Sequence, residues 1–283
     1  MKRILTIAAS SIAVCLFLGN VPAFCQVPSP VPAEQAPKVA NAPIVSAATE
    51  HPIMPVIRWA ERERPNIVAI NDYTAIVQKH ENIDGDIHGV QVMELKLRHR
   101  PFSVYTKFRF PQDLNGQQAI YVQGQNEDKI IGHGVGFQRT LGTHKLDPAG
   151  FIAMRGQKYS ITDIGLLNLV DKLLEVGYKD SRYGECTVKY IEGVTLFKNT
   201  SPRECTVIHV EHPLPRPYFI FYVARIYVDK ELNLPIRYES YEWPRKAGET
   251  PKLIEVYEYR DLKLNVGLTD RDFDPANPAY AFP

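Results

Sequence analysis

The sequence predicts an α+β fold in which one large antiparallel β-sheet carries most of the chain. Runs of alternating apolar and polar residues fill residues 73–123, and similar runs return at residues 218–259. Turn residues such as Asp84-Gly85 separate these runs and favour hairpins. One long helix pattern, residues 162–175, interrupts the strands. Successive strands joined by short turns pair most simply as antiparallel neighbours.

Length and charge narrow the functional classes. The chain has 283 residues, of which 45% are hydrophobic, so it can bury a sizeable core. It carries 33 Lys and Arg against 32 Asp and Glu. Lys2 and Arg3 belong to a leader that we expect to be removed, which leaves 31 basic side chains and a mature charge near −1. This balance argues against a protein that binds nucleic acid or an anionic membrane through bulk electrostatics.

Residues 1–25 have the composition of a secretory signal peptide. Lys2-Arg3 supplies the positive start, residues 4–18 form a short apolar stretch, and residues 21–23 or 23–25 offer a cleavage site. The alternative is an uncleaved N-terminal anchor. Both interpretations predict export, to the periplasm or beyond, and the first leaves no transmembrane segment in the mature chain.

A linker and a single domain are expected to follow. Residues 26–50 are rich in Pro and Ala and have few large apolar side chains, which predicts a disordered linker. The folded domain then spans residues 51–283. It begins with a short amphipathic helix that we expect to end at Pro65. The apolar positions at helical spacing are Ile53, Val56, Ile57 and Ala60.

The second helix pattern is the broadest apolar face in the chain. Thr162 or Asp163 can cap its start, and Gly177 is placed to end it. Its apolar positions are Leu166, Leu167, Leu169, Val170, Leu173 and Leu174. A face this broad is either buried in a core or lies across the mouth of an apolar cavity.

The run at residues 218–228 is apolar on both of its faces. One face carries Tyr218, Ile220, Tyr222, Ala224, Ile226 and Val228, and the other carries Phe219, Phe221, Val223, Arg225 and Tyr227. A strand that is apolar on both faces needs a cover on both faces. One cover can be a helix, and the other is more protein or an apolar ligand.

Two cysteines, Cys186 and Cys205, remain after the leader. In an oxidising compartment an isolated pair predicts a disulfide before a metal or redox site. Both lie in strand-like runs that could be neighbours in one sheet. The alternative is two buried free thiols.

The sequence contains no recognisable catalytic or metal-binding motif, so we predict no catalytic residue, no metal site and no cofactor. His209 and Glu211 would point to one face of a strand and His212 to the other, which argues for exposed edge residues and against a metal site. Four nearby carboxylates are expected to line a solvated face and form cross-strand ion pairs. These are Glu239, Glu242, Glu255 and Glu258.

The closing part of the chain resembles a known family. A strand ending at Asp229, the segment Leu-Pro-Ile-Arg-Tyr-Glu at 234–239, the segment Val-Tyr-Glu-Tyr-Arg-Asp-Leu-Lys-Leu-Asn at 256–265 and the final Asp-Phe at 272–273 follow in order. This order is similar to the C-terminal half of DUF1571, a family of unknown function found largely in planctomycete bacteria, and the likeness covers most of the chain from His51. More distantly, the layout is similar to the lipoprotein-carrier superfamily that includes LolA, LolB and RseB.

That resemblance implies a strongly curved antiparallel sheet, a LolA-like open half-barrel, with a few helices on its concave side and an apolar cavity between them. It carries no catalytic residue onto this chain. The implied function is a non-catalytic periplasmic protein that carries or senses a lipid, an acyl chain or a lipoprotein anchor. The residues expected to line its pocket are Phe219, Phe221, Val223, Tyr227, Leu166, Leu169, Val170 and Leu173.

Two other functions stay open at this point. In the first, the sheet encloses a filled core, and the protein is an interaction or stress-sensing module of the cell envelope that works through an outer face or an edge strand. A hydrolase is a third and weaker option, because a site need not show a motif. Cavity volume separates the first two readings, since a half-barrel packed to ordinary interior density leaves a ligand no room.

Overall fold

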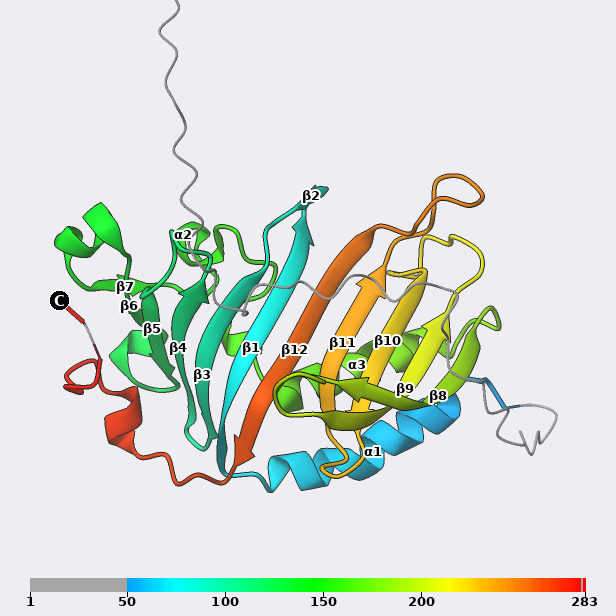
Figure 1. The fold of residues 1–283 in the computed structure, drawn as a ribbon, viewed down its shortest axis with the longest axis horizontal. Coiled ribbons are helices and arrows are strands. Elements are labelled where there is room, and N and C mark those ends of the chain that lie inside the picture. The colour runs from blue at the N-terminus through cyan, green and yellow to red at the C-terminus, as the bar shows by residue number, and fades with distance from the viewer. Residues whose placement is uncertain (1–49, 281) are drawn as a thin grey trace, which may run out of the picture. The chain divides into compact units, whose positions relative to one another are not determined.

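The computed structural model describes residues 50–280 and 282–283 (Figure 1). The predicted signal peptide, residues 1–25, and all but the last residue of the predicted linker, 26–50, lie outside the described residues. Those two assignments and the single domain over 51–283 therefore stay predictions.

Helices make up a small part of the described chain. The α-helices are α1 Met54–Val68, α2 Phe151–Met154 and α3 Leu166–Asp180. Short 3-10 helices are η2 Asn126–Asp128, η3 Gly136–Leu141, η4 Ile161–Asp163 and η5 Asp270–Phe273. Among the described residues, no helix is both long enough and apolar enough to span a bilayer.

The strands form one open antiparallel sheet, which confirms the predicted fold class. They are β1 Asp72–Ile83, β2 Asp86–Ile87, β3 Gln91–His99, β4 Phe102–Phe110, β5 Gln118–Val122, β6 Ile130–His133, β7 His144–Leu146, β8 Thr187–Leu196, β9 Arg203–Glu211, β10 Val223–Asp229, β11 Pro235–Tyr241 and β12 Leu253–Leu264. The order is β7-β6-β5-β4-β3-β1-β12-β11-β10-β9-β8, with β2 paired to β1. The edges are therefore β7 and β8.

The first and last strands of the domain meet in the middle of the sheet, where β1 pairs with β12 (Figure 1). The structure also confirms the predicted turn after β1, because Asp84 and Gly85 both have positive φ, 54° and 93°, and join β1 to β2. Positive φ at two central residues is the geometry that Asp-Gly favours in hairpins.

Alternation along the strands gives the sheet two distinct faces. We call the face toward α1 and α3 the inner face; it carries Tyr73, Ala75 and Val77 of β1, and the paired residues of β3 lie beside them. The opposite, outer face is covered near β4 and β5 by the C-terminal segment, where Tyr280 stacks on Tyr105 at 4.1 Å between ring centroids.

Helix α1 is longer than predicted, because Pro65 does not end it. The helix continues to Val68, and the carbonyl of Pro65 accepts a hydrogen bond from the amide of Ala69 at 3.0 Å. Proline usually breaks a helix by removing a donor and crowding the preceding turn. Here the last turn is held by packing, since Ile67 is fully buried in the core.

The predicted ends of α3 were also wrong. The helix begins at Leu166 after Gly165, and the predicted capping residue Asp163 instead forms a capping box with Ser160 around η4. Gly177 lies inside the helix, not at its end. A Cβ at Gly177 would stand 3.1 Å from Cγ1 of Ile57, so this glycine serves the close contact between α1 and α3.

The strand predicted over residues 218–228 is shorter than expected. Strand β10 begins at Val223, and residues 218–221 leave the sheet. Pro215 and Pro217, which lack an amide donor, precede this stretch and prevent a regular ladder. The rings of Tyr218 and Phe219 stack on Tyr183 and His212 instead.

The predicted disulfide is wrong, because Cys186 and Cys205 are both free and buried. Cys205 pairs across the hairpin with Val194, whereas Thr187, the neighbour of Cys186, pairs with Glu211 at the other end of β8. On β9, Cys205 and Glu211 are six residues apart, which is about 20 Å at roughly 3.3 Å per residue. Burial raises the pKa of each thiol to about 12, so both stay protonated.

Candidate functional site

A cavity of about 1330 Å³ lies between the inner face and the helices. Its lining runs across the sheet from Leu146 of β7 to Val210 of β9, so the sheet curves around it. The opposite wall comes from α1, α3 and the segment between β6 and α3. Much of this lining is apolar, and its large aliphatic and aromatic members include Val77, Met93, Phe108, Ile164, Leu169 and Leu173.

The eight residues predicted to bind a ligand do not lie in one place. Leu169, Leu173 and Phe221 line the cavity. Leu166 and Val170 are fully buried in the core and are not part of the cavity lining. Their role in binding stays a prediction.

The remaining three lie outside the cavity lining. Phe219 stacks on His212 with 3.8 Å between ring centroids. Tyr227 points to the outer face, where its hydroxyl donates to Glu239 at 3.0 Å, and alternation puts Val223 on the same face. The sequence could not show which face of this strand points to the cavity, because both of its faces are apolar. The prediction chose the face with Val223 and Tyr227.

One wall of the cavity is polar. The ammonium of Lys79 donates to Glu81 at 2.8 Å and also to Gln157, and the hydroxyl of Tyr257 donates to the other oxygen of Glu81. Beside them Lys158 pairs with Glu255 at 2.7 Å. Lys79, Glu81 and Glu255 are all buried, and all but Lys158 of this group line the cavity.

Burial sets the protonation of this wall. It lowers the pKa of Lys79, and the attraction of Glu81 offsets that effect only in part. Burial and the nearby Glu81 raise the pKa of Tyr257, so its hydroxyl stays protonated and keeps its hydrogen bond to Glu81. The wall therefore offers an ammonium, two carboxylates and a hydroxyl next to apolar side chains, which suits the polar end of an amphipathic ligand.

Two tyrosines of the sheet fix the start of α3 over the cavity. The amide of Leu166 donates to the hydroxyl of Tyr73 at 2.9 Å, and the amide of Gly165 donates to the hydroxyl of Tyr259 at 3.2 Å. These hydroxyls satisfy amides that a helix start leaves without partners. Sequence reasoning missed them, because both tyrosines lie at ordinary inner-face positions of strands distant in sequence from the helix.

A buried acid and a buried histidine meet at the C-terminal end of α3. Oδ2 of Asp180 lies 3.4 Å from Nε2 of His212, and Asp180 also lines the cavity. Neither Asp180 oxygen has a hydrogen-bond partner among the described residues. Burial raises the pKa of Asp180 to about 6 and lowers that of His212 to about 4. The expectation that His212 is an exposed edge residue was wrong, since it is fully buried.

We expect Asp180→Asn to stabilise the protein above pH 6 by about 1–3 kcal/mol. The folded-state pKa of Asp180 is raised from its usual 3.8 to about 6, so its ionisation lowers stability as pH rises through that window. The lowered pKa of His212 has the opposite effect, so in the variant stability should rise from pH 4 to about 6.5. Urea denaturation at several pH values measures this. A variant less stable than the wild type at pH 8 contradicts it.

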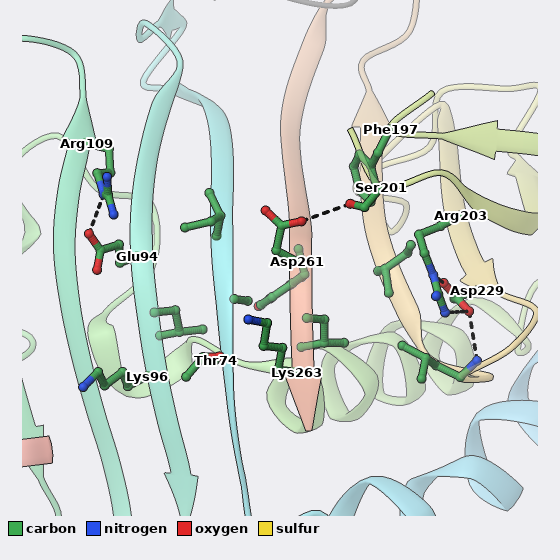
Figure 2. Close-up of a pocket in the computed structure, with 17 residues that line it drawn as sticks. Thr74, Glu94, Lys96, Arg109, Phe197, Ser201, Arg203, Asp229, Asp261 and Lys263 are labelled. Atoms are coloured by element: carbon green, nitrogen blue, oxygen red, sulfur yellow. Dashed lines mark hydrogen bonds and ion pairs between the residues drawn. The ribbon is translucent and has the colours of Figure 1, made fainter. Parts of the chain in front are cut away.

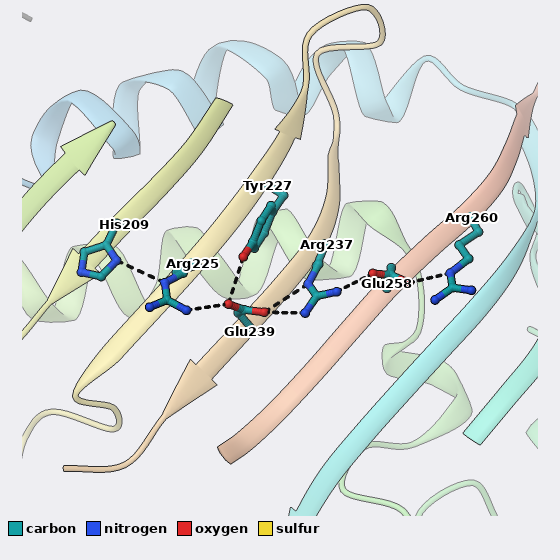
Figure 3. Close-up of polar contacts among 7 residues, drawn as sticks. All are labelled: His209, Arg225, Tyr227, Arg237, Glu239, Glu258 and Arg260. Atoms are coloured by element: carbon teal, nitrogen blue, oxygen red, sulfur yellow. Dashed lines mark hydrogen bonds and ion pairs between the residues drawn. The ribbon is translucent and has the colours of Figure 1, made fainter. Parts of the chain in front are cut away.

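The outer face carries a chain of alternating charges across three strands, β10 to β12, and Arg225 at its end also donates to His209 of β9 (Figure 3). Arg225 donates to Glu239 at 2.9 Å, Arg237 bridges Glu239 at 2.7 Å and Glu258 at 2.6 Å, and Arg260 donates to Glu258 at 2.6 Å. The predicted cross-strand ion pairs are therefore present for Glu239 and Glu258, whereas Glu255 pairs with Lys158, which lies outside the strands. The predicted solvated face is wrong for Glu239, Glu255 and Glu258, which are buried.

We interpret this chain of charges as a structural feature that holds the strands together. Each carboxylate oxygen of Glu239 and Glu258 already accepts from an arginine, and the hydroxyl of Tyr227 adds a further donor to Glu239. Carboxylates that are buried and held by arginines on both oxygens are poorly placed to bind a substrate or a metal. Across residues 50–280 and 282–283, no three His, Cys, Asp or Glu side chains gather as a metal site.

A smaller cavity of about 510 Å³ lies near the loop that joins β8 to β9 (Figure 2). Most of its charged side chains are paired, Arg109 with Glu94, Arg203 with Asp229 and Lys96 with Asp272, and the hydroxyl of Ser201 donates to Asp261 at 3.0 Å. With these groups paired and less than half the volume, it is a weaker candidate than the cavity of the inner face.

The fold and its covered cavity define a protein with an open antiparallel sheet and an internal space lined largely by apolar side chains. The family model described as "Protein of unknown function (DUF1571)" matches residues 70–282. The chain therefore belongs to the DUF1571 family, as its C-terminal motifs predicted. No curated protein shows a significant sequence match.

Several solved structures are similar to this chain. A DUF1329 family protein from Desulfovibrio piger is 14% identical, with 79% of this chain and 98% of that chain covered and a TM-score of 0.37. An outer membrane lipoprotein-sorting protein domain from Vibrio parahaemolyticus is 11% identical, with 77% and 95% covered and a TM-score of 0.36. Lipoprotein LppX from Mycobacterium tuberculosis is 13% identical, with 78% and 100% covered and a TM-score of 0.41. Scores this low carry no functional argument.

Proposed function

We propose that this protein is an exported, non-catalytic binding protein that holds an apolar ligand in the cavity of its inner face. The ligand class is a lipid, an acyl chain or the lipid anchor of a lipoprotein. The main observation behind this proposal is the size of the cavity, about 1330 Å³. Ordinary small-molecule pockets measure roughly 300–1,000 Å³, so this space can take a long chain.

The walls of the cavity support an apolar occupant. Leu169 and Leu173 of α3 are only half-buried although they face the sheet across the cavity. Removing an acyl chain from water is favourable by roughly 0.8 kcal/mol per buried CH₂, before the costs of binding are subtracted. A ligand with one polar end would place that end against the wall formed by Lys79, Glu81 and Tyr257.

The same volume favours a carrier over an interaction module with a filled core. Protein interiors are packed at crystal-like density, with few voids larger than a water molecule. Catalysis has no comparable support, because Lys79 and Glu81 are engaged with each other and with Gln157 and Tyr257. Export rests on the signal-like sequence of residues 1–25.

A cavity-filling variant tests this proposal. Ala119 lies on the inner face of β5 opposite Thr106 and Gly132 and lines the cavity. We expect Ala119→Trp to weaken uptake of a fluorescent fatty acid by about tenfold or more, since tenfold equals the loss of about two buried CH₂ groups. Titration by fluorescence enhancement measures the affinity.

The matched control is Ala247→Trp, which places the same side chain at an exposed position in the loop between β11 and β12, away from the cavity. It should bind like the wild type. Circular dichroism and thermal melting check that both variants fold. Failure of the wild type to take up the fatty acid, or equal binding by Ala119→Trp, would contradict the proposal.

A further inference from the structure

An unusual set of large apolar side chains is exposed beside the cavity. Phe137 and Leu141 of η3 are 80% and 58% exposed, and Phe151 and Ile152 of α2 are 83% and 70% exposed. Scattered exposed apolar residues are ordinary, but four within sixteen residues of chain form a local concentration that calls for a partner.

These residues lie at one end of the sheet, next to an opening of the cavity. The helices η3 and α2 flank the edge strand β7 on either side along the chain, and Figure 1 shows α2 near β5, β6 and β7. Leu141 and Ile152 also line the cavity. The exposed apolar surface is therefore continuous with the lining of the cavity.

The same segment is cationic. Residues 134–158 contain four basic side chains, Arg139, Lys145, Arg155 and Lys158, and one carboxylate, Asp147. Lys158 pairs with Glu255, and Lys145 lies 3.5 Å from Glu127. Among the described residues, Arg139 and Arg155 have no ion-pair partner, so their charges are available to a partner surface.

We propose that residues 136–155, here called the docking segment, bind this protein to the surface of an anionic lipid bilayer. Aromatic and aliphatic side chains insert at the boundary between headgroups and acyl chains, and neighbouring basic side chains bind anionic headgroups. The near-neutral charge of the whole chain does not oppose this, because the attraction acts locally within a Debye length. Bound in this way, the opening of the cavity would face the acyl chains.

Vesicle binding tests the proposal without requiring any ligand in the cavity. The full protein is incubated with vesicles made of equal parts of phosphatidylcholine and phosphatidylglycerol, and bound protein is separated by flotation. We expect binding that weakens with added salt and weakens on vesicles of phosphatidylcholine alone. The double variant Phe137→Ser with Phe151→Ser should bind at least roughly tenfold more weakly, since both rings leave water on docking.

Two controls separate docking from other effects. Leu214→Ser with Val266→Ser removes two exposed apolar side chains outside the docking segment and should leave vesicle binding unchanged. Ala119→Trp should also bind vesicles like the wild type, so failure of fatty-acid uptake and failure of docking are distinguishable. No binding by the wild type, or equal losses in the two double variants, overturns the proposal.

A local probe gives a second measurement. The variant Phe151→Trp places an indole at the most exposed ring of the docking segment. Its added emission should shift to the blue on anionic vesicles and be quenched by lipids brominated in their acyl chains. An unchanged spectrum, or docking to an envelope protein with no response to vesicles, would contradict insertion into a bilayer.

Discussion

Replacing Arg237 by leucine is expected to lower the free energy of unfolding by roughly 3–5 kcal/mol, the usual cost of removing one partner from a buried ion pair. Its guanidinium bridges Glu239 and Glu258, whose side chains are only 3% and 2% exposed. Without it, each carboxylate keeps one arginine but stays buried with an unsatisfied oxygen. Urea denaturation monitored by circular dichroism measures the loss.

Two further variants sharpen this test. Arg237→Lys keeps the charge but cannot form two parallel pairs, so its stability should fall between those of the wild type and Arg237→Leu. Arg58→Leu removes an exposed ion pair with Glu50 and should leave stability nearly unchanged. If Arg237→Leu is as stable as Arg58→Leu, the outer-face charges are not structural.

The difference in unfolding free energy between the wild type and Arg237→Leu should also depend on pH. Burial alone would raise the pKa of Glu239, but Arg237 and Arg225 outweigh it and hold the pKa below its usual 4.5. A carboxylate with a lowered pKa contributes stability above its unfolded pKa and loses it as pH falls through the folded value. The gap between the wild type and Arg237→Leu should therefore narrow below about pH 4.5. A gap that widens in acid would contradict this assignment.

Gly165→Ala is expected to destabilise the protein by roughly 2–5 kcal/mol, from backbone strain and overpacking together. Gly165 has φ of 118°, which side chains rarely tolerate. A Cβ there would lie 2.7 Å from Cδ1 of Leu97 and 2.9 Å from the hydroxyl of Tyr73. Neither neighbour can move away easily, because Leu97 is buried in the core and the Tyr73 hydroxyl holds the start of α3.

Gly89→Ala is the matched control, since nothing lies within 4 Å of its added Cβ and its φ is ordinary. It should unfold like the wild type. Gly165→Ala should also reduce fatty-acid uptake, because it disturbs the contacts that hold α3 over the cavity. Equal stability of the two variants in thermal melts would show that α3 is not anchored as described.

The sheet was predictable from the sequence because its signals are local. Alternation and the Asp84-Gly85 turn identify β1 and its hairpin without reference to the rest of the chain. Helix ends were less predictable. Pro65 and Gly177 are helix breakers by propensity, yet tertiary packing of α1 on α3 overrides both.

The candidate site was predictable in kind but not in detail. The apolar face of α3 identified Leu169 and Leu173, which do line the cavity. The polar wall was missed, because Lys79 on β1 and Glu255 on β12 come together only through the pairing of the first and last strands. The disulfide prediction was wrong for a related reason. The distance between two cysteines on neighbouring strands depends on the register of the strands, which the sequence does not show.

Analysis of the bound lipid tests the central claim most directly. Protein purified under native conditions from its own cells is weighed by native mass spectrometry and then extracted with organic solvent, with the Ala119→Trp variant treated in parallel. We predict a wild-type mass increased by a lipid or acyl compound that reappears in the extract, and a much lower occupancy in the variant. Wild-type protein of bare polypeptide mass, with no lipid in the extract, would contradict the assignment of the cavity as a carrier site.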